Sequence, residues 1–396
     1  MERSRFASVA DRGLKTINGR NLVRAGNTHP SRNTPFRPQG CWQIAARSRL
    51  LFSRAKWLSR LRNEEGNDTT MLEAPRCPVV TLEEHYWDDE LVSHYTGLDA
   101  RGSPELIAGL RDVGAGRIRA MDEAGIDLQV LSHAAPATQQ LRANIAPALT
   151  ARANDRLHAI VAVNSARLAA FAALPTAVPQ AAAAELERCV RELGFVGAML
   201  HGPTDGAFID DKRFWPIFAA AERLDVPIYL HPSIPVQPVI DAYYKDYAQD
   251  FPMILRAAWG FGVETSTLAV RLVLSGVFDA HPGLKIILGH LGEGLPFLLW
   301  RIDHALSRPG QKPVRFRETF ARHFYVTTSG FFSDTALRCC IEELGVDRIM
   351  FSVDYPFEAN APGTRWLADI PLGDEDKAKI ASGNAAQLLR LKLRTA

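Results

Sequence analysis

Glu83 and His85 stand two positions apart in the run TLEEHYW, residues 81–87. Successive side chains of a strand point to opposite faces, so this carboxylate and this imidazole face one side and Glu84 faces the other. An oxygen and a nitrogen offered to the same point are half of a site for a divalent metal ion. By itself, the pattern fits a surface cluster of acids equally well.

Two more candidates each close an apolar run. His231 directly follows the run PIYL and precedes Pro232. A residue before proline favours an extended backbone, and the strand is expected to end there. Asp354 directly follows the run RIMFSV. Burying a carboxylate there is costly unless a cation or hydrogen-bond donors contact it. Taken singly, the histidine fits a satisfied core residue, and the aspartate fits a turn or helix-cap residue.

A third apolar run, KIILG, ends at His290 and leads into LGEG. Gly292 and Gly294 let the backbone approach a ligand closely, and Glu293 lies between them. This strand end therefore offers another imidazole and another carboxylate.

These runs belong to an alternation of short apolar segments with helical patterns, which appear at 181–193, 211–224 and 334–344. Eight such repeats predict an α/β fold, a (β/α)₈ barrel of the TIM type with its active site at the C-terminal ends of the strands. An open doubly wound sheet is the alternative, although no G-x-G-x-x-G follows an early strand. The expected strands are residues 78–85, 127–132, 169–175, 195–200, 227–232, 285–290, 324–329 and 348–356.

The polar candidates all lie where expected strands end. The carboxyl ends of barrel strands meet at one rim, which is where the active sites of such barrels lie. Coincidence is therefore the weaker explanation for Glu83, His85, His231, His290 and Asp354.

Several motifs occur in the order found in a known family: LEEH, GFVGAML, YLHP, LGHLGEGLP, WRIDH, TTSGFF and FSVDYPFE. Between about Val79 and Leu391 the chain resembles amidohydrolase-superfamily decarboxylases of the amidohydrolase-2 type. It is most similar to the γ-resorcylate and 2,3-dihydroxybenzoate decarboxylases, and more distantly to aminocarboxymuconate-semialdehyde decarboxylase.

The resemblance implies nonoxidative decarboxylation of a small aromatic, ortho-hydroxybenzoate-like acid with release of CO₂. It implies one divalent ion, Zn²⁺ or Mn²⁺, and catalytic roles for Asp354, His290 and Glu293. The implied metal ligands are Glu83, His85, His231 and Asp354.

The chain also departs from the family pattern. Resorcylate-type members commonly have Asn where His201 stands, and an Arg-Asn pair where this chain has Ser233 and Ile234. The exact substrate is therefore open. The residues expected to contact the substrate are Trp87, His201, Arg301 and Phe331.

Loss of CO₂ requires a proton at the ring carbon that bears the carboxylate. We expect Asp354 to deliver it as a general acid, with His290 and Glu293 tuning its protonation. A hydrolase on the same scaffold, acting on a lactone or an amide, is the alternative, since Asp354 equally suits a general base there.

Residues 1–70 differ in composition from the barrel predicted at 71–396. They hold 14 Lys and Arg against 5 Asp and Glu, a charge of +9 in a chain whose total is +2. We expect a disordered N-terminal extension, or a true start at Met71. An arm that binds nucleic acid is the non-enzymatic alternative; we expect neither a nucleic-acid nor a membrane partner.

The remaining expectations come from composition and analogy. Hydrophobic residues make up 47% of the chain and charged residues 23%, which excludes a wholly disordered or coiled-coil protein. By analogy with the family we expect a homo-oligomer, a dimer or tetramer. An odd number of cysteines without a C-x-x-C pair favours the reducing cytoplasm; they are Cys41, Cys77, Cys189, Cys339 and Cys340.

Overall fold

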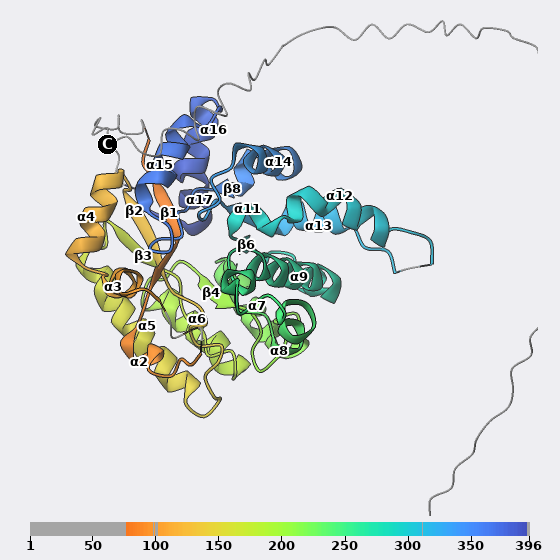
Figure 1. Ribbon diagram of the computed structural model, residues 1–396, viewed down its shortest axis with the longest axis horizontal. Coiled ribbons are helices and arrows are strands. Elements are labelled where there is room, and N and C mark those ends of the chain that lie inside the picture. Colours follow the sequence, from red (N-terminus) through yellow and green to blue (C-terminus); the bar gives the residue numbers. More distant parts are fainter. Residues whose placement is uncertain (1–76, 98, 100–101, 311, 394–396) are drawn as a thin grey trace, which may run out of the picture. The chain divides into compact units, whose positions relative to one another are not determined.

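The chain folds as parallel strands alternating with helices (Figure 1). This computed structural model describes residues 77–97, 99, 102–310 and 312–393. The eight expected strands are all present. They are β1 (Val80–Tyr86), β2 (Leu128–His133), β3 (Leu168–Ala170), β4 (Ala198–His201), β5 (Ile228–His231), β6 (Ile286–Leu288), β7 (Phe324–Thr327) and β8 (Ile349–Met350).

The strands pair in sequence order and run parallel throughout. One sheet has the order β1-β2-β3 and the other the order β4-β5-β6-β7-β8. An isolated parallel bridge between Ala172 and Ala198 joins the two sheets at the β3–β4 seam. The strand order and direction are those of the predicted barrel, while the ladder between the described strands is interrupted at two seams.

The second seam lies between β8 and β1, where the contacts pass largely through a side chain. The Ser352 hydroxyl accepts hydrogen bonds from the backbone N–H groups of Leu82 at 3.1 Å and Glu83 at 2.6 Å. The His85 N–H donates to the Tyr355 carbonyl at 2.7 Å. β8 is only two residues long, so these contacts hold its extension against β1.

The helices cover the outside of the strands (Figure 1). The helical patterns expected at 181–193, 211–224 and 334–344 are present, and Pro216 lies in a first turn. The α-helices are α2 (Asp89–Val92), α3 (Pro104–Arg111), α4 (Ala115–Ala124), α5 (Ala146–Val163), α6 (Pro179–Arg191), α7 (Trp215–Leu224), α8 (Gln237–Val239), α9 (Gly260–Ser275), α10 (Val277–Ala280), α11 (His290–Glu293), α12 (Leu295–Leu306), α13 (Phe316–His323), α14 (Asp334–Leu344), α15 (Asn360–Asp369), α16 (Asp374–Ala378) and α17 (Asn384–Leu389). Short 3₁₀ or π segments are η1 (Lys212–Phe214), η2 (Ile240–Tyr244), η3 (Pro252–Leu255), η4 (Val346–Arg348) and η5 (Lys379–Gly383).

Two apolar layers fill the fold. An outer layer packs the strands against the helices, and an inner cluster gathers side chains from β1, β2, β4, β5, β6 and β8 and from α17. Such layered filling makes the centre of a barrel a packed core rather than a pore. The inner cluster supports the polar rim from below; it includes Leu82, Val130, Met199, Tyr229, Ile287 and Met350.

The expected extension at residues 1–70 and Cys41 lie outside the described residues. Cys77, Cys189, Cys339 and Cys340 are free thiols. Within the described part of the chain, no helix combines the length and apolar character that crossing a membrane requires.

Candidate metal centre

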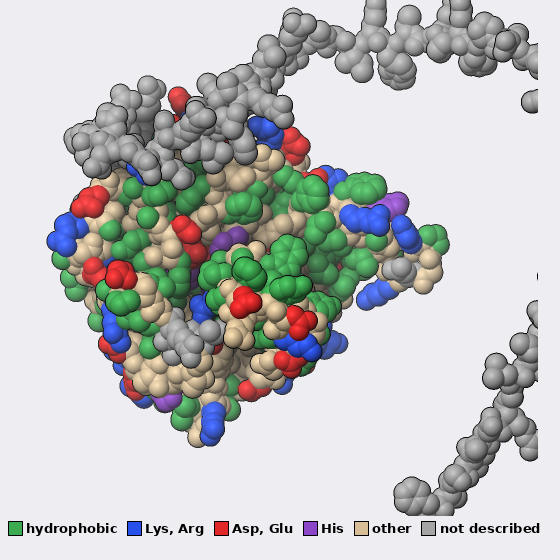
Figure 2. Space-filling view, in the orientation of Figure 1, with side chains coloured by type: hydrophobic (Ala, Val, Ile, Leu, Met, Phe, Trp, Pro, Cys, Tyr) green, Lys and Arg blue, Asp and Glu red, His purple; other side chains and the backbone are tan. Residues whose placement is uncertain are grey.

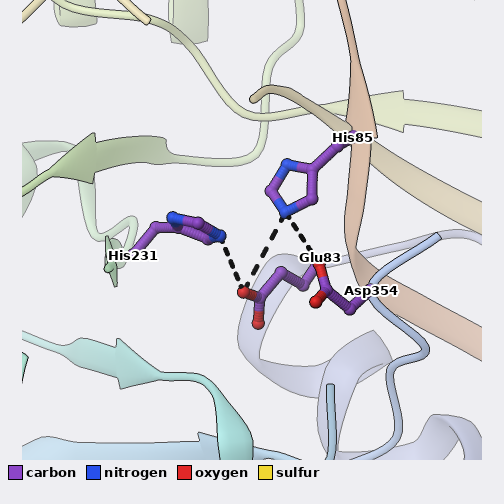
Figure 3. Close-up of side chains that lie close together, drawn as sticks. All are labelled: Glu83, His85, His231 and Asp354. Carbon is purple, nitrogen blue, oxygen red and sulfur yellow. Dashed lines mark ion pairs between the residues drawn. The ribbon is translucent and has the colours of Figure 1, made fainter. Parts of the chain in front are cut away.

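Four side chains from three strand ends converge on one point (Figure 3). Glu83 and His85 come from β1, His231 ends β5, and Asp354 follows β8. Each offers one ligand atom, and these atoms all lie within 4.8 Å of one another. The His231 Nε2 is 3.1 Å from Glu83 Oε1, and the His85 Nε2 is 3.1 Å from Asp354 Oδ1.

Three of these ligand atoms are buried without a hydrogen-bond partner. They are Glu83 Oε1, His85 Nε2 and Asp354 Oδ1. Leaving a buried polar atom unpaired costs about 1–3 kcal/mol, and more when the group is charged. One cation between them would satisfy all three at once, and two imidazoles with two carboxylates suit either Zn²⁺ or Mn²⁺. The residues therefore fit one divalent ion.

The two imidazoles are held in the orientation that metal binding requires. The His231 Nδ1–H donates to the Pro232 carbonyl at 2.7 Å, which leaves the Nε2 lone pair free. His85 Nδ1 lies 3.3 Å from the Ser132 hydroxyl. Partners of this kind fix the ring and the tautomer of a ligating histidine.

Glu83 is held from behind by a buried hydroxyl cluster. The Tyr229 hydroxyl donates to Glu83 Oε2 and lies 2.6 Å from the Thr327 hydroxyl and 3.2 Å from the Ser329 hydroxyl. On another side Gly289 packs so closely that a Cβ there would be 2.6 Å from Glu83 Oε2. One carboxylate oxygen is thus occupied and the other points toward the ligand group.

Charge in the site favours an ionised Glu83 and a neutral His85. Burial opposes ionisation of Glu83, but the imidazoles His290, His231 and His85 outweigh it, so the pKa of Glu83 lies below its usual range. Burial lowers the pKa of His85, against the raising effect of Asp354. A carboxylate and a neutral imidazole are the forms that bind metal.

His290 and Glu293 lie beside the four ligands. His290 Nδ1 is 2.7 Å from Glu293 Oε1, and its Nε2 is 3.8 Å from Asp354 Oδ2. Burial opposes the charged ring, but Glu293 and Glu83 overcome this effect and raise the pKa of His290 well above its ordinary value. A charged imidazole is thus placed between a carboxylate and the metal site.

The turn that presents this pair has an unusual backbone. α11 contains left-handed residues: His290 has φ 48°, Leu291 has φ 53° and Glu293 has φ 55°. Left-handed backbone costs roughly 1–2 kcal/mol per residue for side chains other than glycine. Strain of this kind clusters at functional sites.

The expected substrate contacts have different positions in the structure. His201 is buried, with its ring centroid 4.8 Å from that of His231, and burial together with the neighbouring histidines holds its pKa well below its usual value. Trp87 is half-buried and its Nε1 has no partner. Phe331 is 46% exposed, and Arg301 is exposed on α12.

Three neighbours of the ligands were not anticipated. Phe357 is 43% exposed, and its ring centroid is 5.5 Å from that of His85. Tyr229 stands two positions before His231, so strand alternation could have placed both on one face. No sequence signal identifies Gly289 as a wall of the site.

Figure 2 shows histidine side chains in a hollow beside hydrophobic ones.

The residue pattern of the amidohydrolase family matches residues 85–391. The chain belongs to this family. The family resemblance and the predicted barrel are thereby confirmed.

Several similar proteins from this family are decarboxylases. The gamma-resorcylate decarboxylase of Polaromonas sp. JS666 is 41% identical over 325 residues, which are 79% of this chain and 98% of that protein. A solved 2,6-dihydroxybenzoate decarboxylase in complex with 2,6-dihydroxybenzoate has a TM-score of 0.72 and 39% identity, covering 80% of this chain and 100% of that one. Another solved structure is the dihydroxybenzoic acid decarboxylase of Polaromonas sp. JS666 with manganese and the inhibitor 2-nitroresorcinol. It has a TM-score of 0.73 and 40% identity, and the match covers 79% of this chain and 97% of that one.

Replacing Gly289→Ala tests the packing behind Glu83. The new methyl would push Glu83 Oε2 aside, because the obstructing atom is the end of a side chain. We expect a folded protein whose Mn²⁺ affinity, measured by calorimetry on the metal-free form, falls about 10- to 100-fold. Gly373→Ala is the control, since a Cβ there meets nothing within 4 Å. Unchanged affinity in Gly289→Ala would contradict the assignment of Glu83.

Proposed function

We propose that this protein is a metal-dependent nonoxidative decarboxylase that releases CO₂ from a small aromatic acid carrying an ortho-hydroxyl group. The observation that carries this proposal is the buried cluster of Glu83, His85, His231 and Asp354, in a chain 41% identical to a gamma-resorcylate decarboxylase. A manganese-bound relative supports a divalent ion here, either Mn²⁺ or Zn²⁺.

The metal centre would hold the reacting end of the substrate. Glu83, His85, His231 and Asp354 would bind the ion, which supplies stabilisation of a phenolate and orientation of the substrate. The residues around it must then supply the proton and exclude water.

Asp354 is the proposed proton donor. Its Oδ2 faces His290 Nε2 at 3.8 Å, while its Oδ1 faces the ligand group. His290, kept charged by Glu293, is placed to protonate Asp354. Asp354 then delivers that proton to the ring carbon from which CO₂ departs, and His290 is left neutral.

The aromatic ring would lie between apolar side chains at the mouth of the site. The Phe357 ring lies next to His85 and is 43% exposed, so a ligand at the site can reach it. Phe331, which is 46% exposed, is the proposed second aromatic contact. Trp87, His201 and Arg301 remain proposed substrate contacts. Arg301 carries the positive charge that attracts a carboxylate.

The alternatives have less support. A hydrolase would use the same ligands, but the similar proteins named above are decarboxylases. The nucleic-acid hypothesis depends on residues 1–70, which lie outside the described residues.

Location and assembly stay predictions. The free thiols Cys77, Cys189, Cys339 and Cys340 are compatible with a reducing cytoplasm. A homo-oligomer is expected, and size-exclusion chromatography with light scattering would give its mass.

The proposed activity has a direct experiment. The purified protein is analysed for metal, and the metal-loaded form is mixed with 2,6-dihydroxybenzoate and other ortho-hydroxybenzoates. We expect CO₂ and the corresponding phenol, and no product after removal of the metal by a chelator. Hydrolysis of lactones or amides without release of CO₂ from any hydroxybenzoate would reject the proposal.

Asp354→Asn removes the proposed donor while preserving side-chain volume. We expect kcat to fall by about 10²- to 10⁴-fold, the usual contribution of a general acid. Metal content is measured on the same sample, because Asp354 is also a proposed ligand. Full activity in a variant that retains its metal would exclude Asp354 as donor.

Glu293→Gln tests the charged state of His290. Glu293 raises the pKa of His290, so its removal lowers that pKa. Activity needs the charged ring and declines as pH rises through its pKa. The alkaline limb of the kcat/KM profile therefore moves to lower pH in this variant. Glu222→Gln is the control, since Glu222 lies 2.9 Å from a different histidine, His281. An unmoved limb would show that Glu293 does not set the charge of His290.

A further inference from the structure

Glu84 is a fully buried carboxylate on the opposite face of β1 from the two metal ligands beside it. Its side chain has two oxygens surrounded by donors. The proposed chemistry assigns no role to this group.

Glu84 accepts hydrogen bonds from the backbone N–H groups of the residues on either side of Asp354. The Val353 N–H donates to Glu84 Oε1 at 3.0 Å, and the Tyr355 N–H donates to Glu84 Oε2 at 3.2 Å. Asp354 itself has φ 73°, a left-handed conformation that its Cβ disfavours. Such a conformation persists only when the surroundings over-determine it. The two hydrogen bonds to Glu84 are part of those surroundings.

The same carboxylate is connected to the backbone of Glu83. The Ser352 hydroxyl donates to Glu84 Oε1 at 3.0 Å. Its oxygen accepts the Glu83 N–H at 2.6 Å. One hydroxyl thus links the strand that carries two ligands to the segment that carries Asp354.

A second branch reaches His85. Gln129 Nε2 donates to Glu84 Oε2 at 3.4 Å, and Arg117 Nη1 donates to Gln129 Oε1 at 3.3 Å. Arg117 Nη2 donates to the His85 carbonyl at 2.6 Å. Arg117 is fully buried, so these contacts are shielded from water.

We infer that Glu84 is a positioning residue that fixes Asp354 relative to Glu83 and His85 and so sets the geometry of the metal centre. The inference rests on the metal centre of the proposed function. It follows from where the contacts lie: the network contacts the backbone of Glu83 and His85 and of the two residues on either side of Asp354. It also crosses the β8–β1 seam, where the strands share no continuous ladder and one backbone hydrogen bond, from the His85 N–H to the Tyr355 carbonyl, joins their ends.

The test substitutes Glu84→Gln, which keeps the shape but turns one acceptor into a donor that faces other donors. Metal-free protein is titrated with Mn²⁺ by calorimetry. We expect a 10- to 100-fold loss of affinity, the usual effect of removing a group that orients metal ligands. The Co²⁺-loaded protein is also expected to show a changed visible d–d spectrum, since that spectrum reports ligand geometry.

Asn154→Asp is the matched control. Asn154 is equally buried on α5, donates to the Ala173 carbonyl at 3.0 Å and accepts the Ala173 N–H at 3.1 Å. The substitution also keeps the shape and turns one donor into an acceptor, at the position from which Asn154 Nδ2 donates to the Ala173 carbonyl and, at 2.8 Å, to Glu185 Oε1. It should lower thermal stability but leave the Mn²⁺ affinity and Co²⁺ spectrum at wild-type values.

The outcomes separate the two proposals. Wild-type affinity and spectrum in Glu84→Gln would overturn the positioning role, whatever the activity. A wild-type protein that binds Mn²⁺ but releases no CO₂ would overturn the decarboxylase and leave this inference standing. If Glu84→Gln does not fold, the Ser352→Ala variant tests the inference instead. It removes the hydroxyl that links Glu84 to the Glu83 backbone. A wild-type Co²⁺ spectrum in that variant would reject the inference.

Discussion

Unpaired charge in a buried place is the constraint on which this structure depends. Glu83, His85 and Asp354 each bury a polar atom that forms no hydrogen bond, and all three atoms face one small region. Such an arrangement is unfavourable without a cation and favourable with one. The surrounding residues fix the positions of the ligands. Tyr229 and Gly289 contact Glu83, and the Pro232 carbonyl orients His231. Glu84 accepts hydrogen bonds from the segment around Asp354.

Much of the barrel could be predicted because parallel strands are buried on both faces and read as short apolar runs. All eight strands lie within or next to the expected ranges. The seams could not be predicted. At the β8–β1 seam the strands meet through Ser352 and Glu84, and pairing of a serine with an acid 268 positions away leaves no periodic trace in the sequence.

The ligands of the candidate site were predictable for a different reason. A polar residue at the end of an apolar run is conspicuous, and the carboxyl ends of barrel strands share one rim. The residues around the ligands were less predictable. Gly289 packs against Glu83 and Phe357 packs against His85, and both contacts join residues that are far apart in the sequence. Strand alternation places Glu84 on the other face of β1 from Glu83 and His85. The sequence does not indicate that its carboxylate accepts the N–H groups of Val353 and Tyr355.

The ligands are spread along almost the whole barrel, from β1 to the residue after β8. A ribosome therefore releases Glu83 and His85 long before Asp354, and the site cannot be complete until the final strand has emerged. The four-residue centre is consequently assembled only when β8 has joined the barrel, and a chain truncated before β8 lacks Asp354.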